Sequence, residues 1–149
     1  MRVFVDADAC PAKNEIAMVC KRHGIVPIFA ANKAIPAIAT SPDARMEVVA
    51  GDFDAADDWI IAQAQPGDLV LTADLLLAQR AARQEVDAMN FSGAALTDEV
   101  IHDLVARRNI QQHLREMNIP CDQPIPYSNK NRSRLKAALH EWLERQRRL

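Results

Sequence analysis

Short apolar runs alternate with stretches of helical periodicity along this 149-residue chain, and this alternation restricts the fold more than any other feature. Five runs are expected to form strands, at 3–5, 25–31, 46–50, 69–72 and 86–91. Helical patterns follow at about 11–23, 54–65, 75–84 and 97–117, and a last one begins at about 131. Because parallel strands are joined by helical crossovers, the pattern predicts an α/β fold, a three-layer α/β/α sandwich around a central parallel sheet of about five strands.

The length of the chain fits a single domain over residues 1–149, with a basic helical extension from about residue 131. Pro27 lies within the second predicted strand and suggests that this strand is at or near an edge of the sheet. The segment 32–45 contains two prolines and little periodicity, so we expect a loop there. In the last helix one face is predicted to be apolar, formed by Leu135, Ala138, Leu139, Trp142 and Leu143.

Several classes of protein are disfavoured by composition. No apolar run approaches the ~20 residues of a membrane span, and Asp6 interrupts the first apolar run too early for a signal peptide, so we expect a cytoplasmic protein without a membrane partner. Cys10, Cys20 and Cys121 are widely spaced and odd in number, which disfavours a disulfide framework or a structural zinc site. The sequence leaves the oligomeric state open.

Acidic side chains follow the predicted strands at the points where the strands end. Asp6 and Asp8 come directly after the first strand, and Asp74 follows the fourth. In open parallel sheets ligands bind outside the carboxyl ends of the strands, so these carboxylates are expected to converge there. Carboxylates that lie close together require a shared proton, an opposite charge or a hard cation.

The helix predicted at 54–65 carries further acids in its first turn. Asp57 lies three and four residues before Ile60 and Ile61 and so continues the stripe that should face the core. Asp54 and Asp58 share the same end of the helix, where complementing the helix dipole is an alternative role. Helix capping is likewise an alternative for the acids at the strand ends, Asp8 and Asp74.

Such a carboxylate cluster is typical of a site for Mg²⁺ or Mn²⁺, and two such ions can hydrolyse a phosphodiester without a general-base histidine. We therefore predict Asp6, Asp57 and Asp74 as catalytic residues, with Asp6, Asp8, Asp54, Asp57 and Asp74 as metal ligands. The four histidines show no mutual spacing and are interpreted as surface or packing residues: His23, His102, His113 and His140.

Charge is distributed unevenly, because residues 1–104 carry 16 acidic and 8 basic residues whereas residues 105–149 carry 4 acidic and 10 basic residues. The basic part could contact the phosphates of RNA, and we predict Lys130, Arg132 and Arg134 as substrate-binding residues. A solvated helix face is the alternative explanation for these cations. Two other functions stay open: a non-catalytic module that binds RNA or metal, and a small-molecule phosphatase of the haloacid-dehalogenase type.

Specific motifs carry a family resemblance over nearly the whole chain. They are VDADACP at 5–11, DAADDWI at 54–60, GDLVLTADLLLA at 67–78, and the turn from Asn90 to Gly93. With them the chain resembles the YaiI/YqxD-like family of uncharacterised bacterial proteins, which is grouped with PIN-like nuclease domains. The resemblance implies a sheet with strand order 3-2-1-4-5 and a metal-dependent ribonuclease site. It places Asp6, Asp57 and Asp74 in that acidic site, and Asp8 and Asp54 in the family's own signature.

Overall fold

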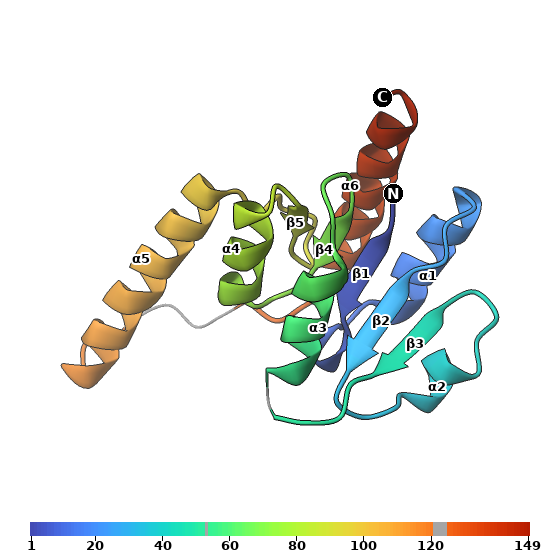
Figure 1. The fold of residues 1–149 in the computed structure, drawn as a ribbon. Helices are drawn as coiled ribbons and strands as arrows, with labels where there is room; N and C mark the ends of the chain where they lie inside the picture. Colours follow the sequence, from blue (N-terminus) through green and yellow to red (C-terminus); the bar gives the residue numbers. More distant parts are fainter. Residues whose placement is uncertain (53, 121–124) are drawn as a thin grey trace.

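The five strands among the described residues form one parallel sheet (Figure 1). The structure is a computed structural model and describes residues 1–52, 54–120 and 125–149. The strands are β1 (Val3–Asp6), β2 (Ile28–Ala31), β3 (Arg45–Val48), β4 (Leu69–Leu71) and β5 (Asp87–Met89). Their order is β3-β2-β1-β4-β5, which is the order that the family resemblance implies.

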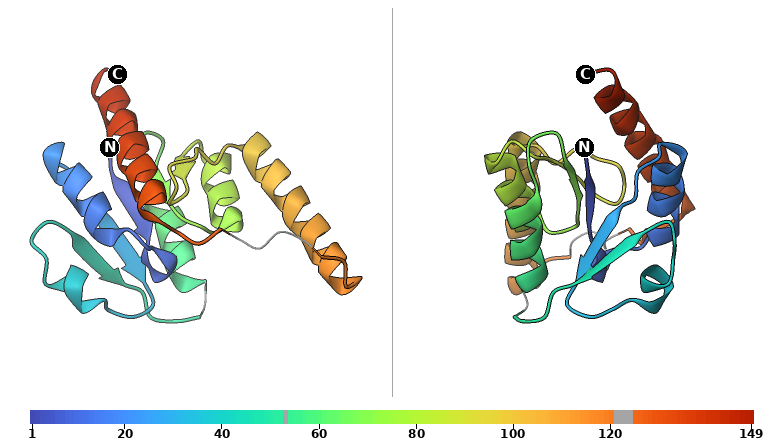
Figure 2. Two further views of the ribbon diagram at one scale, coloured as in Figure 1. Left: turned by 180° about the vertical axis from the view of Figure 1, so that it is seen from behind. Right: turned by 45° about the vertical axis from the view of Figure 1, so that its right-hand side comes forward.

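Helices cover both faces of the sheet, and Figure 2 shows the two helical layers on either side of the strands. One layer contains α1 (Lys13–Arg22) and α6 (Asn129–Arg147), and the other contains α3 (Ala55–Gln63), α4 (Leu75–Arg83) and the first turns of α5 (Asp98–Glu116). The short helix α2 (Pro36–Ala39) lies between β2 and β3, and a 3₁₀ turn, η1 (Ala7–Ala9), follows β1. This arrangement confirms the predicted three-layer α/β/α sandwich.

Side chains of β1 alternate between the two cores. Val3 and Val5 pack with α1 and α6, whereas Phe4 packs with α3 and α4. Because successive residues of a strand point to opposite faces, Asp6 at the end of β1 lies on the same face as Phe4. The strand therefore directs the Asp6 carboxylate toward the layer that contains α3 and α4.

Helix α6 is part of the sandwich. Its residues Leu135, Leu139, Trp142 and Leu143 are buried against the sheet and α1, as the predicted apolar face requires. The Trp142 indole N–H donates a 2.9 Å hydrogen bond to the Asp87 carboxylate at the start of β5. Burial of four large side chains contributes on the order of 6–12 kcal/mol before entropy is counted.

Strand β2 lies next to the edge strand β3, which confirms the predicted position at or near an edge of the sheet, although β2 begins only at Ile28, after Pro27. The prediction of a loop throughout 32–45 is wrong. The segment contains helix α2, whose first residue is Pro36. A proline is tolerated at this position because the first backbone N–H groups of a helix have no partner within the helix. Of the irregular stretch predicted at 118–130, residues 121–124, with Cys121, lie outside the described residues. No helix in the described part of the chain has the length and apolarity to cross a bilayer.

Candidate functional site

Asp6 is a buried carboxylate at the carboxyl end of the central strand. Only 8% of the residue is exposed, and its Oδ2 accepts a 2.8 Å hydrogen bond from the Thr72 hydroxyl. Burial raises the pKa of Asp6, and the negative charges of Asp8 and Asp74 raise it further, against the opposing effect of the Thr72 hydrogen bond. A buried carboxylate whose neighbours are also acidic favours any ligand that carries positive charge.

Asp74 lies at the N-cap of α4, directly after the neighbouring strand β4. Its Oδ1 accepts hydrogen bonds from the backbone N–H groups of Leu76 and Leu77, at 2.8 and 3.3 Å. The structure thus confirms the capping role, which fixes the orientation of this carboxylate. Its own backbone N–H donates to the Thr72 hydroxyl oxygen at 2.9 Å, so Thr72 holds Asp6 and Asp74 in one network.

Asp57 comes from the first turn of α3 and approaches the other two acids from the helical layer. The pKa of Asp57 is raised to about 7, mainly by burial and further by the negative charges of Asp6, Asp74 and Asp54. Its carboxylate is therefore partly removed from water and surrounded by other acids. This shift is the clearest electrostatic sign of a functional site in the fold.

The two remaining predicted ligands lie farther from the centre. Asp8 is an exposed residue of η1 that lines the same cavity as Asp6, and the residue at the N-cap of α1 is Ala12, so Asp8 has no capping role there. Asp54 is exposed at the N-cap position of α3. The described lining of the cavity does not include Asp54, although its charge contributes to the raised pKa of Asp57.

The acidic residues surround a cavity of about 600 Å³ at the carboxyl edge of the sheet. Besides Asp6, Asp8, Asp57 and Asp74, the described lining contains the polar side chains Asn32, Lys33 and Arg108. The side-chain oxygen of Asn32 is buried, and it has no hydrogen-bond partner among the described residues. Carboxylate and amide oxygens are hard donors of the kind that Mg²⁺ and Mn²⁺ prefer, so the residues present fit such an ion.

Sequence reasoning missed Asn32, Lys33 and Arg108 as members of this site. Asn32 and Lys33 directly follow β2, so the rule that located the aspartates also applies to them. Arg108 lies in the middle of α5, and no local pattern relates it to the strand ends. The Arg108 side chain reaches the cavity wall only because of the position of α5 relative to the sheet.

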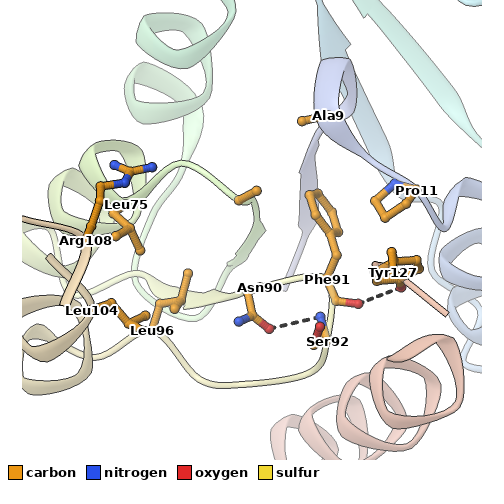
Figure 3. A pocket seen from close by; sticks show the side chains of 11 residues that line it. Ala9, Pro11, Leu75, Asn90, Phe91, Ser92, Leu96, Leu104, Arg108 and Tyr127 are labelled. Atoms are coloured by element: carbon orange, nitrogen blue, oxygen red, sulfur yellow. Dashed lines mark hydrogen bonds between the residues drawn. The ribbon is translucent and has the colours of Figure 1, made fainter. Parts of the chain in front are cut away.

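A second cavity of about 390 Å³ adjoins the first and shares with it Ala9, Ala73, Leu75 and Arg108. Figure 3 shows the side chains that line this second cavity. Its wall carries Phe91 and Tyr127, whose hydroxyl group donates a 2.7 Å hydrogen bond to the Phe91 carbonyl oxygen. The Asn90 side-chain oxygen accepts from the Ser92 backbone N–H at 3.0 Å, which leaves its amide NH₂ group directed away from that bond. The acidic cavity is therefore continuous with an aromatic one.

The three predicted substrate-binding cations lie in the first turns of α6. Arg132 stacks over the Tyr127 ring at 5.2 Å and pairs with Glu15 at 3.6 Å. Neither of the two described cavities has Lys130, Arg132 or Arg134 in its lining. The structure thus brings together Asp6, Asp8, Asp57 and Asp74, and places the cations of α6 on a neighbouring surface.

Comparison with known proteins places the chain in a family. A family model described as "Uncharacterized BCR, YaiI/YqxD family" matches residues 4–145. A UPF0178 protein of Rhodospirillum rubrum is 35% identical over 144 residues, which cover 97% of this chain and 96% of the relative. A UPF0178 protein of Brucella ovis is 37% identical over 137 residues, which cover 92% of this chain and 85% of the relative. No solved structure gives a significant match. The chain belongs to the YaiI/YqxD family of uncharacterised bacterial proteins.

Proposed function

We propose that this protein is a divalent-metal-dependent nuclease that hydrolyses phosphodiester bonds of RNA. The proposal takes Asp6, Asp57 and Asp74 as catalytic residues that hold Mg²⁺ or Mn²⁺, with Asp8 and Asp54 adding negative charge. One observation carries it: acids from β1, α3 and α4 meet at one cavity, and there the pKa of Asp57 rises to about 7.

The acidic cluster alone is electrostatically unfavourable, since like charges at such a site repel and are partly removed from water. A divalent cation offsets this repulsion and supplies Lewis acidity toward a phosphate and its attacking water. The chain's own residues would hold the substrate: Lys33 and Arg108 line the same cavity and could bind the phosphate oxygens. Thr72 holds the Asp6 carboxylate and the backbone of Asp74 in fixed positions.

RNA is the favoured substrate because the acidic cavity is continuous with the aromatic one. Phe91 and Tyr127 offer an apolar wall for a nucleobase, while Asn90 offers an amide for its polar edge. Lys130, Arg132 and Arg134 at the start of α6 would contact phosphates farther along the strand. A single-stranded substrate fits better than a duplex, because only an unpaired base can enter such a cavity.

The test is a cleavage assay with the purified full chain, Mn²⁺ or Mg²⁺, and either single-stranded RNA or a small phosphomonoester. We expect the wild type to cleave RNA, and we expect Asp6→Asn and Asp74→Asn each to reduce the cleavage rate at least 100-fold. Asn retains the capping ability of Asp at position 74, so that variant should fold. The matched control is Asp52→Asn, which removes an exposed acid outside the described lining of the cavity.

Metal binding is measured separately from activity. Mn²⁺ should raise the melting temperature of the wild type and of Asp52→Asn by several degrees at saturating concentration, but not that of the Asp6→Asn/Asp74→Asn double variant. Mn²⁺ binding without cleavage would favour the non-catalytic module. Hydrolysis of the phosphomonoester alone would favour the phosphatase. Equal inertness of wild type and Asp74→Asn on every substrate would remove the nuclease proposal.

A further inference from the structure

A second cluster of ligating side chains lies between α1 and α6. His23 directly follows α1, and its side chain is only 3% exposed. His140 and Glu144 lie four residues apart on α6 and therefore on one face of that helix. His140 is exposed and the Glu144 side chain is 37% exposed, so the cluster reaches from the protein interior to solvent.

The hydrogen bonding of this cluster is incomplete. His23 Nε2 lies 2.8 Å from His140 Nδ1, a distance at which one ring donates to the other. The second ring nitrogen of His23, Nδ1, is buried and has no hydrogen-bond partner among the described residues. Glu144 Oε1 lies 3.6 Å from that nitrogen, which is too far for a hydrogen bond. A buried nitrogen left without a partner is unfavourable unless something else contacts it.

We propose that His23, His140 and Glu144 form a binding site for a transition-metal ion, with Zn²⁺ as the expected occupant. One ligand atom from each residue lies within 4.8 Å of the other two. In a tetrahedral zinc site with bonds of about 2.0–2.2 Å, ligand atoms are roughly 3.3–3.6 Å apart. The 3.6 Å between His23 Nδ1 and Glu144 Oε1 is therefore close to the spacing of two ligands on one ion.

The ligand chemistry distinguishes this site from the acidic cavity. Two imidazoles and one carboxylate suit Zn²⁺, Co²⁺ or Ni²⁺, whereas a set of oxygen donors suits Mg²⁺ or Mn²⁺. The two sites also lie at opposite edges of the sheet, because His23 ends the helix that returns from the carboxyl edge of the strands (Figure 1). A zinc ion here would link the end of α1 to α6 and leave a fourth position to water.

The surrounding charges are compatible with the ion. Burial lowers the pKa of His23, and His140 and Arg147 lower it further against the opposing charge of Glu144. Neutral imidazole is the form that binds a metal, and the hydrogen bond between the two rings breaks when His23 and His140 both bind the ion, because a neutral ring has only one nitrogen free of a proton. Arg147 Nη1 lies 4.0 Å from Glu144 Oε1 and is exposed enough to move away when the carboxylate binds an ion.

The experiment is a calorimetric titration of the full chain with Zn²⁺, and one ion per chain is expected at the cluster. His140→Ala and Glu144→Gln should each weaken that binding at least 10-fold, and both replace residues with exposed side chains, so they should fold. His113→Ala removes an exposed histidine of α5 and serves as the matched control with unchanged affinity. The Asp6→Asn/Asp74→Asn double variant should also retain the zinc site, which separates this inference from the proposed nuclease.

Co²⁺ gives an independent spectroscopic measurement, because a tetrahedral site with nitrogen ligands produces visible absorption bands. Those bands should appear with wild type and His113→Ala and be lost in His140→Ala. The proposal is overturned if wild type binds no Zn²⁺, or if His140→Ala and Glu144→Gln bind it as tightly as wild type. Loss of zinc in the Asp6→Asn/Asp74→Asn variant with retention in His140→Ala would equally overturn it, since the ion would then belong to the acidic cavity.

Discussion

The Thr72 hydroxyl group donates a 2.8 Å hydrogen bond to the Asp6 carboxylate between the ends of β4 and β1. The register explains this contact: Val5 pairs with Leu71, so the next residue of each strand lies beside the other. Thr72 is fully buried and its oxygen also accepts the backbone N–H of Asp74. One side chain thus positions two of the three proposed catalytic acids.

Replacement of Thr72 by valine should therefore destabilise the protein. Valine has nearly the same shape but leaves the buried Asp6 carboxylate and the Asp74 N–H group without this partner, at a cost of about 1–3 kcal/mol in the free energy of unfolding. Loss of the donor should also raise the pKa of Asp6, since that hydrogen bond lowers it. Urea unfolding measures the first effect, and Thr72→Ser, which keeps the hydroxyl, should lie within about 1 kcal/mol of wild type.

Asp57 should make stability depend on pH in the metal-free protein. Its pKa is raised from 3.8 to about 7, so between about pH 4 and pH 7 the folded state retains a proton that the unfolded chain releases. Stability contributed by this group is therefore complete below pH 4 and falls as pH rises to 7. Asp57→Asn cannot ionise, and its unfolding free energy should exceed that of wild type by on the order of 1–2 kcal/mol at pH 8.

The measurement for Asp57 is urea unfolding of both proteins at pH 4 and pH 8 in the presence of a chelator. The gap between variant and wild type should be near zero at pH 4 and should open toward pH 8. Asp58→Asn is the matched control, because Asp58 is exposed and paired with Arg80 at 2.8 Å. A constant gap at both pH values would show that Asp57 does not titrate in this range.

Arg108 should contribute to RNA binding, and its neighbour Arg107 should not. Arg108 lines both cavities, whereas Arg107 is an exposed residue of the same helix outside their described lining. In a binding titration with single-stranded RNA, Arg108→Ala should weaken affinity several-fold. The slope of the logarithm of the binding constant against the logarithm of the salt concentration should become shallower by about one, which corresponds to one lost phosphate contact. Equal losses from the two alanine variants would point to non-specific attraction by α5.

Gly93 should tolerate no side chain, because the turn after β5 lies against α6. Its φ is +85°, and a Cβ there would lie 2.7 Å from the Arg134 carbonyl oxygen and 2.9 Å from the Ala138 Cβ. Gly93→Ala should cost about 2–4 kcal/mol by urea unfolding, from backbone strain and overpacking together. Gly24 also has a positive φ of +69°, but a Cβ at this position would have no atom within 4 Å. Gly24→Ala should therefore lower the free energy of unfolding only through backbone strain, by about 1–2 kcal/mol.

The convergence of Asp6 and Asp74 at one cavity could be predicted from the sequence, because both follow buried strands and parallel strands all end at the same edge. The core-facing position of Asp57 was also visible, since a polar residue interrupts an apolar stripe of α3. Arg108 could not be found in this way, because its place depends on the path of α5 across the fold. His23 and His140 are 117 residues apart and meet only through the packing of α1 on α6.

Pro27 shows the same limit at the boundary of an element. The strand was rightly expected at or near an edge of the sheet, since β2 lies next to the edge strand β3, but the proline precedes the first position at which β2 pairs with its neighbours. Element boundaries shift by two or three residues without changing the hydrophobic pattern, so composition alone could not tell a proline inside the strand from one before it.

The position of α6 in the sandwich also sets the order in which the protein can fold during synthesis. Val3 and Val5 are among the first residues made, yet their buried face is completed by Leu139 and Leu143 near the other end of the chain. At about 5–20 residues per second, a ribosome needs roughly 3–11 seconds to proceed from the end of β5 to Leu143. During that interval α1 alone covers this face of the nascent sheet, so part of the apolar surface stays open to a chaperone until α6 emerges.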